Sequence, residues 1–243
     1  MLFGDISDEI KLYQFHVSPY CGKVRAVLRY KNIPYTVQPV HPVDRRQLLW
    51  VSRQRRVPVL THGPRAIVDS TAIVRYLEDI VPLPSVYPRG RRSRAQALLW
   101  EDWADESLQR VIGPLKFLDR ENARQVAGRE ARYSSPAAGK AMWRMRPVIA
   151  VQMSMFGQTA SRRKLKLRLR ELITLLSDRM EGLYLVGDRP SVADFSVYAV
   201  LEAFEDLNGW SVIEEFDNVL AWYRRVQNTA LGKDPQRMPE RLH

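Results

Sequence analysis

A segment with three prolines, VPLPSVYPR at residues 81–89, divides the sequence into two parts with different hydrophobic periodicity. Proline lacks a backbone N–H and keeps the preceding residue extended, so this segment fits neither a helix nor the interior of a sheet. Short strand-like patterns fill the part before it, and helical spacing dominates the part after it. We therefore expect one domain at residues 1–80, a linker at 81–90 and a second domain at 91–243.

The first part predicts a unit of two parallel strands joined by a helix. Residues 11–17 (KLYQFHV) alternate as a strand does, residues 20–30 carry apolar side chains at helical spacing, and residues 34–40 (PYTVQPV) form a second strand. A hairpin of two short strands follows at 57–60 and 66–68. A further helix opens near Asp69, so the order is that of an α/β domain of the βαβββα type.

The second part predicts an all-α helical bundle. Helical spacing is expected over residues 91–118, 136–155, 163–180, 191–208 and 216–227. Residues 120–135 are more polar, and we expect them to form a mobile connection rather than a helix.

Composition excludes several classes of protein. With 243 residues, 45% hydrophobic and 27% charged, the chain matches a globular protein with a substantial core. No apolar run reaches the roughly 18 residues of a membrane span, and the first ten residues do not match a signal peptide, so we expect a cytoplasmic protein without a membrane partner. A single cysteine, Cys21, and four histidines offer no metal-ligand spacing, so no metal is expected.

The formal net charge of +11 raises the question of a nucleic-acid partner. The positive excess is concentrated in residues 86–170, with arginine clusters at 89–94 and 162–170. The second cluster alternates with leucines, which is typical of the solvated face of a helix, and aromatic residues do not interleave with it as base stacking requires. Nucleic-acid binding is therefore not expected.

Four short motifs allow the sequence to be compared with a known protein family. They are Ser18-Pro19-Tyr20-Cys21 between the first strand and helix, Val57-Pro58, Asp69-Ser70, and the S/T-x-x-D element Ser191-Val192-Ala193-Asp194. In this order, before and after a proline-rich linker, they resemble the cytosolic glutathione S-transferase superfamily, with its thioredoxin-like first domain. The run at residues 18–35 (SPYCGKVRAVLRYKNIPY) is equally similar to the glutathione-binding part of the second membrane-associated prostaglandin E synthase.

The resemblance implies that Ser18 stabilises a glutathione thiolate at the start of a helix, where free amides and the helix dipole favour an anion. A simple N-cap serine is the alternative reading of Ser18. Cys21 takes the shielded second position of the redox motif C-x-x-C, so a buried structural thiol is expected, with a mixed disulfide as the alternative.

The resemblance also implies the residues that bind glutathione. The backbone of Val57, before a proline that is cis in the family, meets the cysteinyl part, while Asp69 and Ser70 hold the γ-glutamyl group. Capping of the next helix is the alternative role for that pair. Arg56 is expected to meet the glycine carboxylate, with Arg55 as the alternative, because neighbouring strand residues point to opposite sides.

The implied enzyme is a glutathione S-transferase that directs the glutathione thiolate at an apolar electrophilic small molecule. The second substrate is expected in a cleft lined by Tyr13, His16, Trp100, Trp103 and Ser107, although the tryptophan spacing also fits ordinary packing. Two alternatives stay open: a glutathione-dependent isomerase or reductase, and a non-catalytic partner-binding module. A homodimer and a role in detoxification are implied by the resemblance only.

Overall fold

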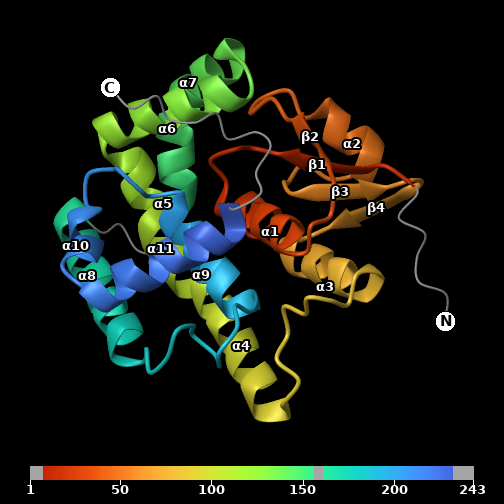
Figure 1. Cartoon of the computed structure of the whole chain (residues 1–243). Coiled ribbons are helices and arrows are strands. Elements are labelled where there is room, and N and C mark those ends of the chain that lie inside the picture. The colour runs from red at the N-terminus through yellow and green to blue at the C-terminus, as the bar shows by residue number, and fades with distance from the viewer. Residues whose placement is uncertain (1–7, 156–160, 232–243) are drawn as a thin grey trace, which may run out of the picture.

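The N-terminal domain is a four-stranded mixed sheet with helices on both faces. The computed structural model describes residues 8–155 and 161–231 (Figure 1). The elements of this domain are β1 (Ile10–Gln14), α1 (Pro19–Tyr30), β2 (Thr36–Pro39), α2 (Arg46–Ser52), β3 (Val59–His62), β4 (Arg65–Val68) and α3 (Ser70–Ile80). The strand order is β2-β1-β3-β4. β1 runs parallel to β2 and antiparallel to β3, and β3 and β4 form an antiparallel hairpin, as the sequence predicts.

Alternation along the strands fixes which residues face which helix layer. Leu12 and Leu60 pair across β1 and β3 and pack in the large core with α1 and α3. Tyr13 and Val59 point to the opposite face, where Leu48 of α2 covers them. α2 is absent from the sequence prediction, because its seven residues bury a single leucine and carry Trp50 at 87% exposure. So short a helix gives no readable period.

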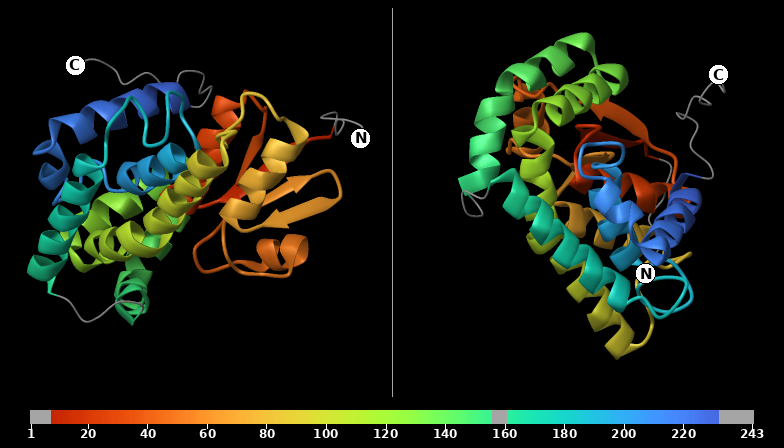
Figure 2. Two further views of the ribbon diagram at one scale, coloured as in Figure 1. Left: turned by 90° about the horizontal axis from the view of Figure 1, so that it is seen from below. Right: turned by 90° about the vertical axis from the view of Figure 1, so that its left-hand side faces the viewer.

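The C-terminal domain is helical. Its elements are α4 (Arg91–Trp103), a π-helical turn (Ala104–Leu108), α5 (Gln109–Leu118), α6 (Arg120–Tyr133), α7 (Pro136–Met155), α8 (Arg162–Asp178), α9 (Val192–Glu202), α10 (Ser211–Glu214) and α11 (Asp217–Leu231). Figure 2 shows the strands and α1–α3 on one side of the molecule and the later helices on the other. The chain is thus a thioredoxin-like α/β domain followed by a helical bundle, which confirms the expected fold class.

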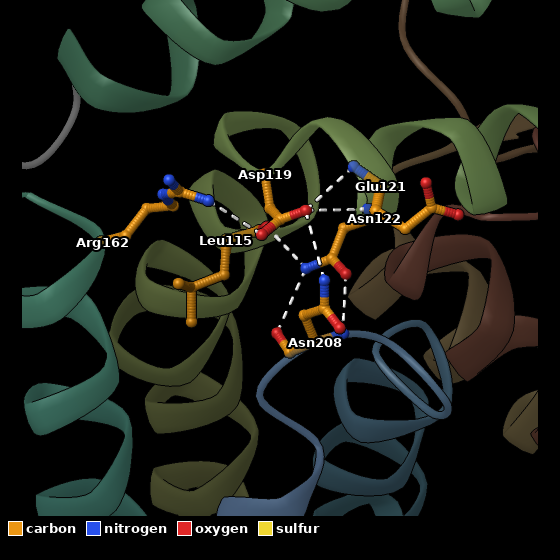
Figure 3. A network of polar contacts seen from close by, with 6 residues as sticks. All are labelled: Leu115, Asp119, Glu121, Asn122, Arg162 and Asn208. Atoms are coloured by element: carbon orange, nitrogen blue, oxygen red, sulfur yellow. Dashed lines mark hydrogen bonds and ion pairs between the residues drawn. The ribbon is translucent and has the colours of Figure 1, made fainter.

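The expected mobile connection at residues 120–135 is wrong, because this segment forms α6. Asp119 caps the helix by accepting hydrogen bonds from the amides of Glu121 (2.9 Å) and Asn122 (3.2 Å), and it pairs with Arg162 at 3.0 Å. The Asn122 side chain accepts from the amide of Asn208 at 2.6 Å (Figure 3). The Asp119 cap is local, but the partners Arg162 and Asn208 lie 43 and 86 positions away along the chain, so the polar composition of α6 conceals its helical state.

The two domains meet around α1. Lys23 of α1 is almost fully buried and pairs with Glu101 of α4 at 2.9 Å and with Asp105 of the π-helical turn at 3.1 Å. Its ammonium group also donates to the Thr71 hydroxyl of α3 at 3.2 Å. This buried network fixes the start of α3 and the π-helical turn relative to each other.

Candidate functional site

A cavity of about 740 Å³ lies where the N-terminal domain faces α4–α5 and α7. Its described lining residues come from the start of α1, the segment before β3, the end of β4, the start of α3, the π-helical turn and helices α5 and α7. They are Tyr20, Gln54, Arg56, Val57, Pro58, Val68, Asp69, Ser70, Asp105, Glu106, Gln109, Arg110, Pro114 and Gln152.

All five residues that the sequence assigns to glutathione binding line this cavity. They are Arg56, Val57, Pro58, Asp69 and Ser70. The Val57-Pro58 peptide bond is cis, as it is in the family pattern. Arg55, the alternative cation, is not among the described lining residues, and its carbonyl accepts a hydrogen bond from Arg45. The fold therefore brings two separate sequence segments, Arg56-Val57-Pro58 and Asp69-Ser70, to one wall.

The start of α3 forms an anion-receptive corner of the cavity. Asp69 caps the helix by accepting from the amide of Ala72 at 3.0 Å, and Ser70 is buried as the first helical residue. The first amides of a helix have no intrahelical acceptor, so they are available to a carboxylate. Asp69 adopts φ 74°, a left-handed backbone that costs a non-glycine residue about 1–3 kcal/mol. This conformation places the Asp69 carboxylate beside the amide donors of α3. The combination suits a ligand group that carries both a positive and a negative charge.

Ser18 occupies the expected place at the start of α1, but it does not line the cavity. It is the N-cap residue and is half-buried. Burial raises the pKa of the Cys21 thiol to about 11, and the nearby Ser18 hydroxyl and Arg25 charge oppose this effect only in part. Cys21 is fully buried and therefore has the environment of a structural thiol.

Tyr20 was not singled out from the sequence, although it lies inside the SPYC motif. Among the described residues, it is the aromatic side chain on the cavity wall. Burial, with Asp105 and Glu106 adding to it, raises the pKa of Tyr20 to about 12, so its hydroxyl keeps its proton and can donate. The position of Tyr20 inside the SPYC motif was thus the sequence feature that could have identified it as a cavity residue.

The opposite wall of the cavity is polar. Asp105 and Glu106 belong to the π-helical turn, and Gln109 and Arg110 follow in α5, with Arg110 paired to Glu106. Burial raises the pKa of Asp105, and the Lys23 ammonium partly offsets this. This wall was not predicted from the sequence, because packing decides which face of a long helix meets another domain.

The aromatic cleft expected for a second substrate is not found on the described cavity wall. Trp100 and Trp103 pack edge to face with ring centroids 5.1 Å apart and are half-buried against the core. His16 stacks on Tyr133, with centroids 3.6 Å apart. Tyr13 is buried in the sheet layer under α2. These side chains therefore serve packing.

The basic run on α8 has acidic partners. Arg162 pairs with Asp119 at 3.0 Å, Arg168 pairs with Glu171 at 2.7 Å, and Arg170 pairs with Glu215. Leu165 and Leu169 are buried, whereas Leu167 is exposed. The helix thus presents a solvated, salt-bridged face.

The described residues contain neither a metal-binding cluster nor a membrane-spanning helix. Across residues 8–155 and 161–231, no three histidine, cysteine or acidic side chains are grouped so that they could hold a metal ion. Within the same ranges, none of the helices is both long and apolar enough to cross a bilayer.

Comparison with known proteins assigns the family. Residues 12–85 match the model of the glutathione S-transferase N-terminal domain, and residues 159–225 match that of the C-terminal domain. The chain belongs to the glutathione S-transferase superfamily.

Three similar proteins illustrate the range of the superfamily. Prostaglandin E synthase 2 of Danio rerio is 24% identical over 92% of this chain and 72% of its own length. A probable glutathione S-transferase, GSTU6, of Oryza sativa subsp. japonica is 34% identical over 42% of this chain and 47% of its own. The crystal structure of the beta-etherase LigF from Sphingobium sp. strain SYK-6 has a TM-score of 0.69 at 19% identity and covers 92% of this chain and 99% of that one, which is a likeness of fold.

Proposed function

We propose that this protein is a glutathione transferase that binds reduced glutathione in the cavity at the domain junction. One observation carries the proposal: Arg56, Val57, Pro58, Asp69 and Ser70, from separate segments, line a single cavity that includes the start of α3. The superfamily assignment supports it.

The residues present fit the chemistry of glutathione. Asp69 offers an acceptor for the γ-glutamyl ammonium, and Ser70 with the first amides of α3 offers donors for its carboxylate. The backbone before Pro58 can exchange hydrogen bonds with an extended peptide, and Arg56 can meet the glycine carboxylate. The ammonium group and the two carboxylates of glutathione thus each have a partner of complementary charge or hydrogen-bonding capacity along one wall of the cavity.

Glutathione, when bound, supplies a thiol whose deprotonated form is the nucleophile. The start of α1 provides donors that favour such an anion: the Ser18 hydroxyl, the first free amides of the helix and the protonated Tyr20 hydroxyl on the cavity wall. We assign Ser18 as the thiolate-stabilising residue, with Tyr20 as the second donor.

The second substrate is a small electrophile. Glu106, Gln109 and Arg110 make the wall facing the glutathione residues polar. An electrophile that carries polar groups of its own therefore fits this wall better than the wholly apolar one indicated by the sequence.

Calorimetry with reduced glutathione tests the binding site. We expect a Kd in the micromolar to low millimolar range. In the Asp69→Ala, Ser70→Ala double variant the Kd should rise by at least about tenfold, because charge-assisted hydrogen bonds to glutathione are lost. Asp79→Ala, on the exposed side of the same helix, is the matched control and should bind as the wild type does. Failure of the wild type to bind would refute the proposal and favour a non-catalytic partner-binding module.

The thiolate donors are tested by titrating the ultraviolet absorbance of the bound thiolate. Ser18→Ala should raise the pKa of the bound thiol by about one unit, and Tyr20→Phe should raise it less. An unchanged pKa in Ser18→Ala with a raised pKa in Tyr20→Phe would transfer the role to Tyr20.

A glutathione-dependent isomerase is the second candidate. The similarity to prostaglandin E synthase 2 over 92% of this chain favours it. Product analysis separates the two: conjugates formed from model electrophiles support the transferase, whereas rearranged products that consume no glutathione support the isomerase.

Homodimerisation, a cytoplasmic location and a role in detoxification complete the proposal. The homodimer and the role in detoxification rest on the resemblance to the superfamily alone, and the cytoplasmic location rests on the sequence pattern described above. Sedimentation velocity at micromolar concentration tests the first of them, because a dimer has twice the mass of the 28.2 kDa chain.

A further inference from the structure

The loop between β1 and α1 is bound by charged side chains of the helical domain. The amide N–H of Val17 donates to Glu130 Oε2 of α6 at 3.2 Å, and the carbonyl of Val17 accepts from Lys116 Nζ of α5 at 2.8 Å. Both main-chain groups of one residue are thus held by ionisable side chains that lie 113 and 99 positions further along the chain.

The burial of Lys116 and Glu130 at this position costs free energy. Their exposed fractions are 2% and 0%, and the second carboxylate oxygen of Glu130, Oε1, is buried with no hydrogen-bond partner among the described residues. Burial lowers the pKa of Lys116 to about 7 and raises the pKa of Glu130, while each charge partly offsets the effect on the other. Two apolar residues would fill the same space at a lower desolvation cost. Packing alone therefore does not account for the pair.

The rest of the loop is bound in the same way. Arg25 Nη2 donates to the carbonyl of His16 at 3.1 Å, and Arg25 Nη1 donates to the Gln14 side chain at 2.8 Å. The His16 ring is stacked on Tyr133, at the end of α6. Ser18, the N-cap of α1, follows Val17 directly, so the position of the Val17 peptide sets where α1 begins.

We propose that Glu130 and Lys116 are positioning residues that hold the Val17 peptide and thereby place the Ser18 hydroxyl and the first amides of α1 at the thiol site. The assignment of a thiol to this place rests on the proposed function. A donor stabilises a thiolate only within hydrogen-bond distance, so loosening the peptide by about an ångström weakens the stabilisation.

The first test is the pKa of the bound glutathione thiol, read from thiolate absorbance, with the Kd measured alongside by calorimetry. Glu130→Leu and Lys116→Met should each raise the thiol pKa by about one unit and change the Kd less than about threefold, because other residues hold the two ends of glutathione. Glu130→Gln keeps an acceptor oxygen and should stay close to the wild type. Glu121→Leu on α6 and Lys140→Met on α7 alter exposed residues and serve as matched controls.

The second test is amide hydrogen exchange, which requires no glutathione. Glu130→Leu should speed exchange of the Val17 amide by at least about tenfold while the amides of β3 and α3 exchange as in the wild type. If Glu130→Leu does not fold, Glu130→Gln and Lys116→Met carry the comparison, with faster exchange expected for Lys116→Met.

The outcomes separate the two proposals. A wild type that binds no glutathione refutes the proposed function, and the exchange result then decides whether the pair holds the loop. Faster exchange with an unchanged thiol pKa overturns the positioning role, since the loop then moves without consequence for the thiol. A raised thiol pKa with unchanged exchange also overturns it, because the charges would then act directly rather than through the position of the loop.

Discussion

Lys23 on α1 and Glu101 on α4 form an ion pair of 2.9 Å with exposed side-chain fractions of 2% and 5%, so the two domains are joined by buried charge. Asp105 and Thr71 complete the coordination of the ammonium group. The pair lies directly behind the cavity, because Asp105 also lines it.

Lys23→Met should lower the free energy of unfolding by about 3–5 kcal/mol, because the buried carboxylate of Glu101 and the partly exposed carboxylate of Asp105 lose their counter-charge. Urea denaturation measures this loss. Arg46→Met removes an exposed pair with Asp44 and should cost less than about 1 kcal/mol. Equal losses in the two variants would contradict a buried network at the domain junction.

His16 should make the protein acid-sensitive. Burial, together with the charges of Arg25, Arg29, Arg129 and Lys116, lowers the pKa of His16 to about 2, whereas an unfolded histidine titrates near 6.5. Between these values the unfolded state binds the extra proton, so stability falls as the pH falls below about 6.5.

His16→Phe keeps a ring against Tyr133 and removes this titration. From pH 7 to pH 5 the wild type should lose about 2 kcal/mol more stability than the variant. Urea denaturation of both proteins at pH 7 and pH 5 measures this difference in stability. Parallel pH dependence of the two proteins would show that His16 is protonated in the fold.

Asp194 should serve folding rather than glutathione binding. Its carboxylate is fully buried and accepts from the amides of Ser191 (2.8 Å) and Leu185 (2.9 Å) and from Trp222 Nε1 (2.8 Å). Asp194→Ala leaves these donors unsatisfied and should cost about 3 kcal/mol of stability or more.

Calorimetry on the folded Asp194→Ala fraction should give the glutathione affinity of the wild type. Asp188→Ala changes an exposed carboxylate in the preceding loop and should leave stability within about 0.5 kcal/mol of the wild type. A large loss of affinity in Asp194→Ala at retained stability would refute the structural role.

Cys21 should be inert in the native protein. With a thiol pKa of about 11, roughly one molecule in a thousand carries the thiolate at pH 8, and the sulfur is buried. A chromogenic disulfide reagent should therefore react with the native protein at least about a hundredfold more slowly than with the guanidinium-unfolded chain. Rapid native reaction would instead support mixed-disulfide chemistry with glutathione.

The sequence by itself predicted the order of the elements apart from α2 and α6, and the residues of the proposed glutathione-binding wall. Period-two and period-3.6 patterns are local, so strands such as β1 and helices such as α9 follow from neighbouring residues alone. Arg56, Val57, Pro58, Asp69 and Ser70 were found because motif positions keep their order along the chain. Their common cavity then follows from the strand order β2-β1-β3-β4.

Tertiary structure alone decided the remainder of the site. α6 is polar in sequence because its buried face holds Asn122 and Glu130, whose partners Asn208 and Val17 lie at distant positions. The exposure of Tyr20 to the cavity and the polar wall of the π-helical turn likewise depend on how the helical domain packs against the first domain. Burial and long-range hydrogen bonds are properties of the packed chain, so no local pattern encodes them.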